Sequence, residues 1–283
     1  MWRAQRYGGR IAPDAVPVES LRDDLVRLGL RPGETVMVHA SLRRLGPVEG
    51  GAAGVVDAID AAVGPDGTVL MLLGARDDWA WVNRRPEPER AALLADAEPF
   101  DHRTTPADPE IGVLAEVFRT LPGTVVNDHP ESRFAARGAR ATELVDDAPW
   151  DDYYGPGSPL ERLIEARGRI LRLGADPDTV TALHHAEYLA HVPSKRRLRR
   201  HRRVLTPDGP QICTVECLDD ETGIVPWDGE DYFAIILREY VATGRASQGM
   251  VANAQSELLD AADLVDFGAR WMSDAFCPSR LGR

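Results

Sequence analysis

The sequence predicts an α/β fold, because short apolar runs typical of buried strands alternate with segments of helical spacing. Residues 169–191 show this alternation most clearly. An apolar run over 170–173 stops at Gly174, and Pro177 then favours an extended turn. Good helix formers without Gly or Pro occupy 182–190. A buried strand should therefore end at Gly174, and a helix should follow it.

The helix expected over 182–190 carries a polar face. Either Asp178 or Thr179 can cap its start. Four side chains recur at helical spacing and are expected on one face: His184, Glu187, Tyr188 and His191. Because α/β proteins tend to hold catalytic groups where a strand end leads into a helix, this stretch is the candidate active site.

Composition limits the class of protein. The chain has 283 residues, 43% of them apolar, which is enough for a large core and argues against disorder. No run approaches the ~20 apolar residues of a membrane span, so we expect a soluble, cytoplasmic protein with no membrane partner. Three cysteines without a CxxC pair disfavour a disulfide scaffold or a structural zinc site.

The net charge of −12 disfavours nucleic acid as the main ligand, since phosphate contact needs a positive field. It suits a cationic partner, although by itself the charge favours simple solubility over the steering of a substrate.

The chain divides into an arm, one domain and a tail. Residues 1–17 lack periodicity and are expected to form a flexible arm; 18–276 form a single domain, and 277–283 a frayed tail. Within the domain, helices are expected at 21–29, 52–63, 111–121, 141–145, 160–166, 232–243 and 260–275, and strands at 35–39, 68–73, 124–126 and 211–218.

The segment after the first strand, 41–51, is rich in small residues and leads into a helix. Free N–H groups and the helix dipole could bind a phosphate there. The segment matches neither GxGxxG nor GxxxxGK[ST], so a plain connection remains an alternative.

Residues 74–109 form a long, largely irregular insertion where a second strand–helix unit was expected. Such insertions in compact domains commonly bind ligands. The alternative is a solvated lid stabilised by Trp79, Trp81 and Phe100. Its acids are Asp77, Asp78, Glu87, Glu89, Asp96, Glu98, Asp101 and Asp108.

Residues 195–203 contain seven Lys or Arg in nine positions. This run could bind RNA or cofactor phosphates, but it lacks interleaved aromatic residues, which favours a solvated arm paired with acids elsewhere. The strand that follows, 211–218, delivers Asp219, Asp220 and Glu221 at its end.

The residues favour general base chemistry. The sequence has no GxSxG elbow and no HExxH pair, whereas a histidine oriented by a carboxylate can take a proton near neutral pH. A nearby cluster of acids would hold a polyamine. A metal-dependent hydrolase using the same pair, and a nucleic-acid module using 195–203, stay as alternatives.

Four motifs carry a family resemblance. They are Val38-His-Ala-Ser-Leu with Gly46-Pro-Val-Glu-Gly-Gly, Pro99-Phe-Asp, His129-Pro-Glu-Ser, and Asp178-Thr-Val-Thr-Ala-Leu-His-His-Ala-Glu-Tyr-Leu-Ala. From about Ser20 to Phe276 the chain resembles the aminoglycoside 3-N-acetyltransferases of the antibiotic N-acetyltransferase family.

The resemblance implies a layered α/β/α sandwich with a central mixed sheet. The implied reaction is acetyl transfer from acetyl-CoA to the 3-amino group of a 2-deoxystreptamine aminoglycoside, which gives antibiotic resistance. It would proceed by general base catalysis in a ternary complex, without a metal, in a monomer or homodimer.

The resemblance also implies site residues. His184 would be the base, oriented by Glu187, Asp219 or Glu221. Acetyl-CoA would contact His39, Ser41, Leu42, Gly46, Val48, Gly50, Gly51 and Thr179. The aminoglycoside would contact Asp77, Asp78, Glu98, Asp101, Asp219 and Glu221.

Overall fold

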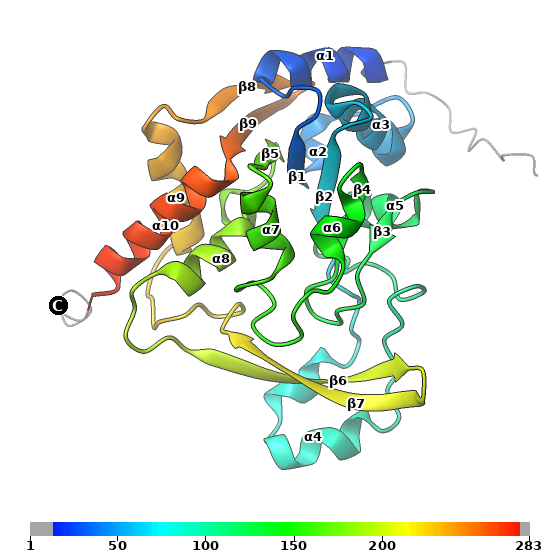
Figure 1. The fold of residues 1–283 in the computed structure, drawn as a ribbon, viewed down its shortest axis with the longest axis vertical. Helices are drawn as coiled ribbons and strands as arrows, with labels where there is room; N and C mark the ends of the chain where they lie inside the picture. Colours follow the sequence, from blue (N-terminus) through cyan, green and yellow to red (C-terminus); the bar gives the residue numbers. More distant parts are fainter. Residues whose placement is uncertain (1–13, 278–283) are drawn as a thin grey trace, which may run out of the picture.

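A seven-stranded sheet forms the centre of the molecule (Figure 1). The computed structural model describes residues 14–277, so most of the predicted arm and nearly all of the predicted tail lie outside the described residues. Three strands run parallel in the middle of the sheet: β1 (Thr35–Ala40), β2 (Thr68–Leu72) and β5 (Arg169–Leu173). Their carboxyl ends meet at one edge, where ligands of α/β proteins commonly bind.

Each outer strand pairs antiparallel with its neighbour, which makes the sheet mixed as expected. On one side lie β4 (Phe134–Gly138) and β3 (Val125–Val126). On the other side lie β9 (Ala254–Asp260) and β8 (Ser247–Val251). The sequence interpretation missed β8 and β9 because exposed polar residues interrupt their apolar positions.

Helices cover both faces of the sheet. Val36 and Val38 point into one core with α1 (Val18–Leu28), α3 (Gly51–Val63) and α5 (Val113–Thr120). Met37 points into the other core, as the alternation of a strand requires. The helices contributing to that second core are α6 (Ala141–Val145), α7 (Pro159–Glu165), α8 (Ala182–Leu189), α9 (Tyr232–Ala242) and α10 (Ala261–Ala275).

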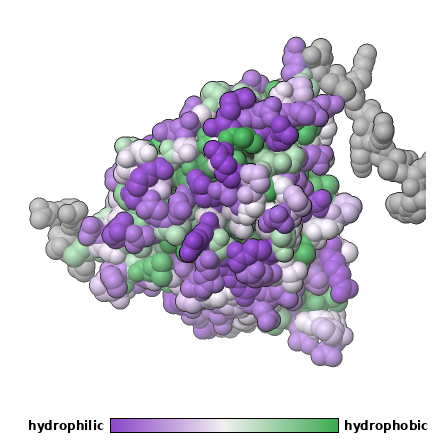
Figure 2. All heavy atoms as spheres, turned by 45° about the horizontal axis from the view of Figure 1, so that its top comes forward, coloured by the Kyte–Doolittle hydropathy of each residue, from purple (hydrophilic) through white to green (hydrophobic). Residues whose placement is uncertain are grey.

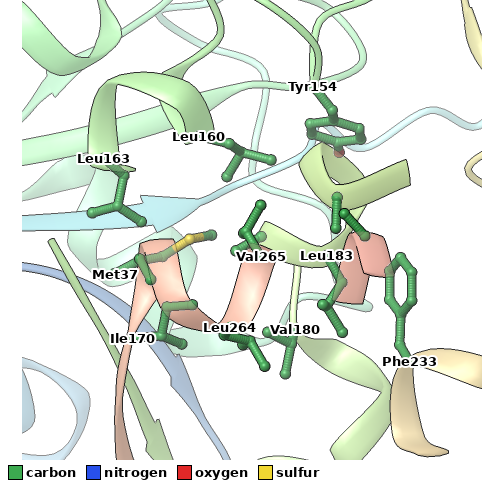
Figure 3. Packing of buried hydrophobic residues seen from close by; sticks show 14 of the residues in the cluster. Met37, Tyr154, Leu160, Leu163, Ile170, Val180, Leu183, Phe233, Leu264 and Val265 are labelled. Atoms are coloured by element: carbon green, nitrogen blue, oxygen red, sulfur yellow. The ribbon is translucent and has the colours of Figure 1, made fainter. Parts of the chain in front are cut away.

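The second core joins strands to helices directly. Figure 3 shows Met37 and Ile170 of the sheet close to Leu160 and Leu163 of α7 and Val265 of α10. All five side chains are buried. The helix α8 packs against α10 and α7 in this same core, which holds it near the edge where the parallel strands end.

The organising stretch folds as strand, turn and helix, with two corrections. Residues Pro177–Thr179 form a short 3-10 turn (η2), so neither predicted cap residue caps α8; Thr181 stands at its N-terminal boundary. The helix ends at Leu189, because Pro193 disfavours helical backbone just before it. His191 is therefore not on the helical face.

The basic run is a strand and not a solvated arm. Residues Arg197–Thr206 form β6, which pairs along its length with β7 (Gly209–Leu218). This hairpin crosses the bottom of Figure 1, next to α4 (Glu87–Leu94) of the insertion. The insertion is otherwise mostly irregular, with a 3-10 turn, η1, at Ala80–Arg84.

The remaining features complete the layers. A short helix, α2 (Leu42–Leu45), follows β1, and Val16 pairs with Val48, so the last residues of the predicted arm are attached to the domain. The face shown in Figure 2 is mostly hydrophilic, with scattered hydrophobic residues. Within residues 14–277, none of the helices combines the length and apolar character needed to cross a bilayer.

Candidate active site

A cleft of about 530 Å³ opens at the carboxyl ends of the parallel strands. Its walls come from the loop after β1, the segment 110–114, and the turn 175–181 between β5 and α8. His184 of α8 and Phe233 of α9 also line it. The predicted histidine thus faces a space that can hold a ligand.

Three side chains form a hydrogen-bonded chain at this cleft. Nδ1 of His184 lies 2.8 Å from Oε2 of Glu187, one helical turn further along α8. The hydroxyl of Tyr232, at the start of α9, donates to Oε1 of Glu187. Since Glu187 accepts at both oxygens, it holds the proton of His184 on Nδ1 and leaves Nε2 as the nitrogen that can take another proton.

Aromatic rings hold the imidazole of His184 in place. Tyr154 stacks on it with ring centroids 4.8 Å apart, and Phe233 meets it edge-on at the same distance. Burial alone would lower the pKa of His184, but the charge of Glu187 and its hydrogen bond outweigh burial, and the pKa is raised. The ring is therefore both fixed and basic.

The expected acetyl-CoA contacts divide into two groups. His39, Ser41, Leu42 and Thr179 line the cleft beside His184. Gly46, Val48, Gly50 and Gly51 are not among the cleft-lining residues. The reason is α2, which separates them from the strand end in the chain, while Val48 pairs with Val16.

His39 has an unsatisfied polar atom in the cleft. Its Nε2 is buried and has no hydrogen-bond partner among the described residues. Burial, with the nearby charge of Arg172, lowers the pKa of His39 to about 3. A neutral imidazole with an open hydrogen-bonding position can accept from, or donate to, a bound ligand.

A second cleft of about 900 Å³ lies between the insertion and the β6–β7 hairpin. Glu110 lines both clefts. Asp77, Asp78 and Glu221 line this second cleft, as do Glu131 and Asp220, which the sequence interpretation did not select. Seven carboxylates and five guanidinium groups stand among its lining residues.

Three predicted acids lie elsewhere. Asp219 accepts hydrogen bonds from the backbone of Glu221 and Thr222, so its carboxylate closes a turn and does not approach His184. Asp101 likewise accepts from the backbone of Arg103 and from the hydroxyl of Thr104. Glu98 lines a neighbouring cavity of about 330 Å³.

Two other polar residues have structural contacts. Nδ1 of His129 accepts from the backbone of Glu131 and Ser132, and its Nε2 lies 2.8 Å from the carbonyl oxygen of Trp150. The hydroxyl of Tyr188 donates to Asp152, so Tyr188 does not join the site around His184.

The sequence interpretation did not identify three residues that surround His184 and Glu187, because they lie far from 184 in the sequence: Tyr154, Tyr232 and Phe233. No local spacing signals such contacts.

This fold and site define an enzyme that handles a proton at a cleft on the edge of an α/β sheet. Within residues 14–277 there is no group of three His, Cys, Asp or Glu side chains arranged to hold a metal ion. A sequence model described as aminoglycoside 3-N-acetyltransferase matches residues 37–273. The chain belongs to this family of acyltransferases, as the four motifs predicted.

Individual relatives agree over nearly the whole chain. An aminoglycoside N(3)-acetyltransferase VII from Streptomyces paromomycinus is 39% identical, over 93% of this chain and 92% of the relative. An aminoglycoside N(3)-acetyltransferase III from Serratia marcescens is 38% identical, over 92% and 98%.

Solved structures show the same fold. AAC-IIIb in a binary complex with CoASH has a TM-score of 0.87 and 39% identity, covering 93% of this chain and 98% of that one. AAC-VIa bound to sisomicin has a TM-score of 0.84 and 37% identity, covering 92% and 98%. The predicted layered α/β fold is confirmed.

Proposed function

We propose that this chain transfers an acetyl group from acetyl-CoA to the 3-amino group of a 2-deoxystreptamine aminoglycoside, and so confers resistance to that antibiotic. The observation that carries the proposal is the His184–Glu187–Tyr232 chain, placed on a cleft in a fold whose relatives are acetyltransferases of this kind.

His184 serves as the general base. An amine is mostly protonated near pH 7 and cannot attack a thioester until it loses a proton. Nε2 of His184 removes that proton, directly or through one water. The amine nitrogen then bonds to the thioester carbon, the carbon–sulfur bond breaks, and a proton returns to the CoA sulfur.

Glu187 and Tyr232 are positioning residues for this base. Glu187 holds Nδ1–H and stabilises the imidazolium that forms, while the Tyr232 hydroxyl keeps the carboxylate in place. We do not assign Asp219 or Glu221 to this role, because Asp219 closes a turn and Glu221 lines the second cleft.

Acetyl-CoA occupies the cleft beside His184. His39, Ser41, Leu42 and Thr179 contact it there, with the buried, unpartnered Nε2 of His39 as a hydrogen-bonding partner for its polar groups. The structure titled AAC-IIIb binary with CoASH supports a CoA site in this fold. The rest of the predicted segment supports the loop without lining the cleft: Gly46, Val48, Gly50 and Gly51.

The aminoglycoside occupies the second cleft. Asp77, Asp78, Glu131 and Glu221 offer carboxylates to its ammonium groups, since charge-assisted hydrogen bonds are the strong ones. Glu98 and Asp101 do not line this cleft, so we assign them no direct contact with the drug. The relative AAC-VIa, solved with sisomicin, supports a drug site in this family.

We expect the protein in the cytoplasm, where acetyl-CoA is made, as a monomer or homodimer. We expect no nucleic-acid partner; the pairing of Arg197 and Arg199 in the basic run with carboxylates supports this expectation.

A thiol-release assay tests the function. Purified protein is mixed with acetyl-CoA and aminoglycosides that have or lack a free 3-amino group. Release of CoA only with the free amine, and mass spectra showing one added acetyl group, are expected. Release that continues without any aminoglycoside, or that stops after chelation, would support a hydrolase instead.

A further inference from the structure

Arginines of the β6 strand enter the second cleft. Along β6, side chains alternate between two faces, so Arg200 and Arg202 share one face and Arg197 and Arg199 the other. Arg200 and Arg202 line the cleft that we assign to the aminoglycoside, as does Arg199 from the other face, whereas Arg197 does not. Positive groups are unexpected in a site for a polycation, because like charges repel.

Arg200 and its neighbour Tyr153 occupy both carboxylate oxygens of Asp220. Its Nη2 donates to Oδ1 of Asp220 at 2.7 Å, and its Nη1 donates to the Tyr153 hydroxyl at 2.9 Å. The same hydroxyl donates to Oδ2 of Asp220 at 2.8 Å. Both oxygens of Asp220 are therefore engaged before any ligand arrives.

The contacts of Arg200 extend to two further carboxylates. Nη2 lies 3.7 Å from Glu221, and Nε lies 3.9 Å from Glu131. Only 16% of the Arg200 side chain and 14% of the Asp220 side chain are exposed. The pair is thus shielded from water, which keeps its electrostatic effect on a neighbouring ligand strong.

Arg202 differs from Arg200. Its guanidinium donates to the carbonyl oxygens of Pro130 and Arg76 and lies 5.2 Å from the ring centre of Phe100. These contacts attach the strand to the insertion. Arg202 also lies 3.7 Å from Asp77 and 3.6 Å from Glu131, but its hydrogen bonds go to carbonyl oxygens. The hydrogen bonds of Arg200 go instead to Asp220 and Tyr153, whose side chains are ionisable.

We propose that Arg200, through its pairing with Asp220, determines specificity in the second cleft. Beside this pair, the cleft favours acceptors that present a hydroxyl group and disfavours acceptors that present an ammonium group. A hydroxyl can accept from a guanidinium or donate to a carboxylate. An ammonium would meet Arg200 and find Asp220 already occupied. This inference rests on the proposed acetyl transfer.

The test uses pairs of aminoglycosides that differ by one such group. Paromomycin and neomycin B differ at a single ring position by hydroxyl against amine, and kanamycin A and kanamycin B do so at another. For each pair, the ratio of kcat/KM for the hydroxyl compound to that for the amino compound is measured with the natural chain.

Arg200→Met should lower this ratio in at least one pair by about tenfold, because Asp220 becomes available to the ammonium. Asp220→Asn should raise the same ratio, since Arg200 then acts without its partner. The ratio for the double variant should lie between the ratios for the two single variants. Arg197→Gln, a matched control on the outer face of the same strand, should leave the ratio unchanged.

Opposite shifts in the two single variants mark a charge effect, since a merely structural role would weaken both compounds alike. Equal losses for both members of each pair, or a ratio that stays within about twofold in every folded variant, would overturn the proposal. If Arg200→Met does not fold, Asp220→Asn and the double variant decide. If the natural chain acetylates none of the four compounds, the proposed function fails instead.

Discussion

Burial should make the imidazole of His184 a weaker base, yet its pKa is raised. The charge of Glu187 and its hydrogen bond to Nδ1 outweigh the burial. Tyr154 and Phe233 add no charge, but they fix the plane of the ring. A base so placed needs little rearrangement before it takes a proton.

His184→Ala should lower kcat by a factor of about a hundred or more, because a positioned general base typically contributes that much. The far-ultraviolet circular dichroism should not change. His185→Ala is the matched control: Nδ1 of His185 contacts the carbonyl oxygen of Tyr154, so it should lower the Tm while changing kcat little. Equal kinetic effects of the two variants would contradict the assignment of the base.

The pH dependence of kcat/KM tests the role of Glu187. The base must be neutral to accept a proton, so activity should fall as the pH drops through the pKa of His184, which is raised above its ordinary value by Glu187. In Glu187→Gln, burial is no longer opposed by a carboxylate. The pKa of His184 should fall, the acidic limb should move to lower pH, and kcat should drop at least about tenfold. An acidic limb at the same pH in both proteins would exclude Glu187 as the partner.

At the scale of elements, β6 works as two different surfaces. Its outer arginines pair with solvent-exposed acids; Arg197 contacts Asp152 and Glu216, and Arg199 contacts Glu87 and Glu216. Its inner arginines, Arg200 and Arg202, bond to groups of the second cleft and the insertion, and Arg199 also lines that cleft. A charged run can therefore form an ordered strand when each face finds carboxylates or carbonyl oxygens.

Replacing Arg197 and Arg199 together by Gln should change the KM for acetyl-CoA by less than about twofold, because exposed ion pairs contribute little and these groups already have partners. The measurement is made at low and high salt. A KM that rises strongly at low salt only would mean that the outer face of β6 contacts cofactor phosphates, since such contacts are screened by ions.

At the scale of the whole molecule, one buried arginine attaches the insertion to the sheet. Arg133 precedes β4, and its guanidinium donates to the carbonyl oxygens of Gly74, Thr105 and Pro106. Phe100 of the insertion also pairs with β6 through backbone hydrogen bonds. The walls of the second cleft are therefore held from two sides.

Arg133→Met should lower the free energy of unfolding by roughly 2–4 kcal/mol, because the hydrogen bonds of a fully buried guanidinium to three carbonyl oxygens are lost. The KM for the aminoglycoside should rise more than that for acetyl-CoA, which we propose to bind in the other cleft. Urea unfolding and steady-state kinetics measure both effects. Arg137→Met on β4, which breaks the half-exposed pair with Asp60, is the control and should cost about 1 kcal/mol or less. Equal costs for the two variants would contradict the anchoring role.

Sequence patterns alone determined the elements whose signals are local. The strand ending at Gly174, the helix that carries His184 and Glu187, and the parallel strands at the centre follow from apolar runs, glycine and proline positions, and helical spacing. The i, i+3 spacing also brought His184 and Glu187 together, since such residues are neighbours on any helix. The family motifs predicted the family and its fold.

Only the tertiary structure decided which distant groups meet. Tyr232 reaches Glu187 from another helix, Asp219 turns its carboxylate to its own loop, and Arg200 closes on Asp220 across a hairpin. These contacts depend on strand pairing and helix packing between segments tens of residues apart, and no local spacing encodes them. The basic run shows the same limit, because its charges suit solvent until the acids of other segments are placed against them.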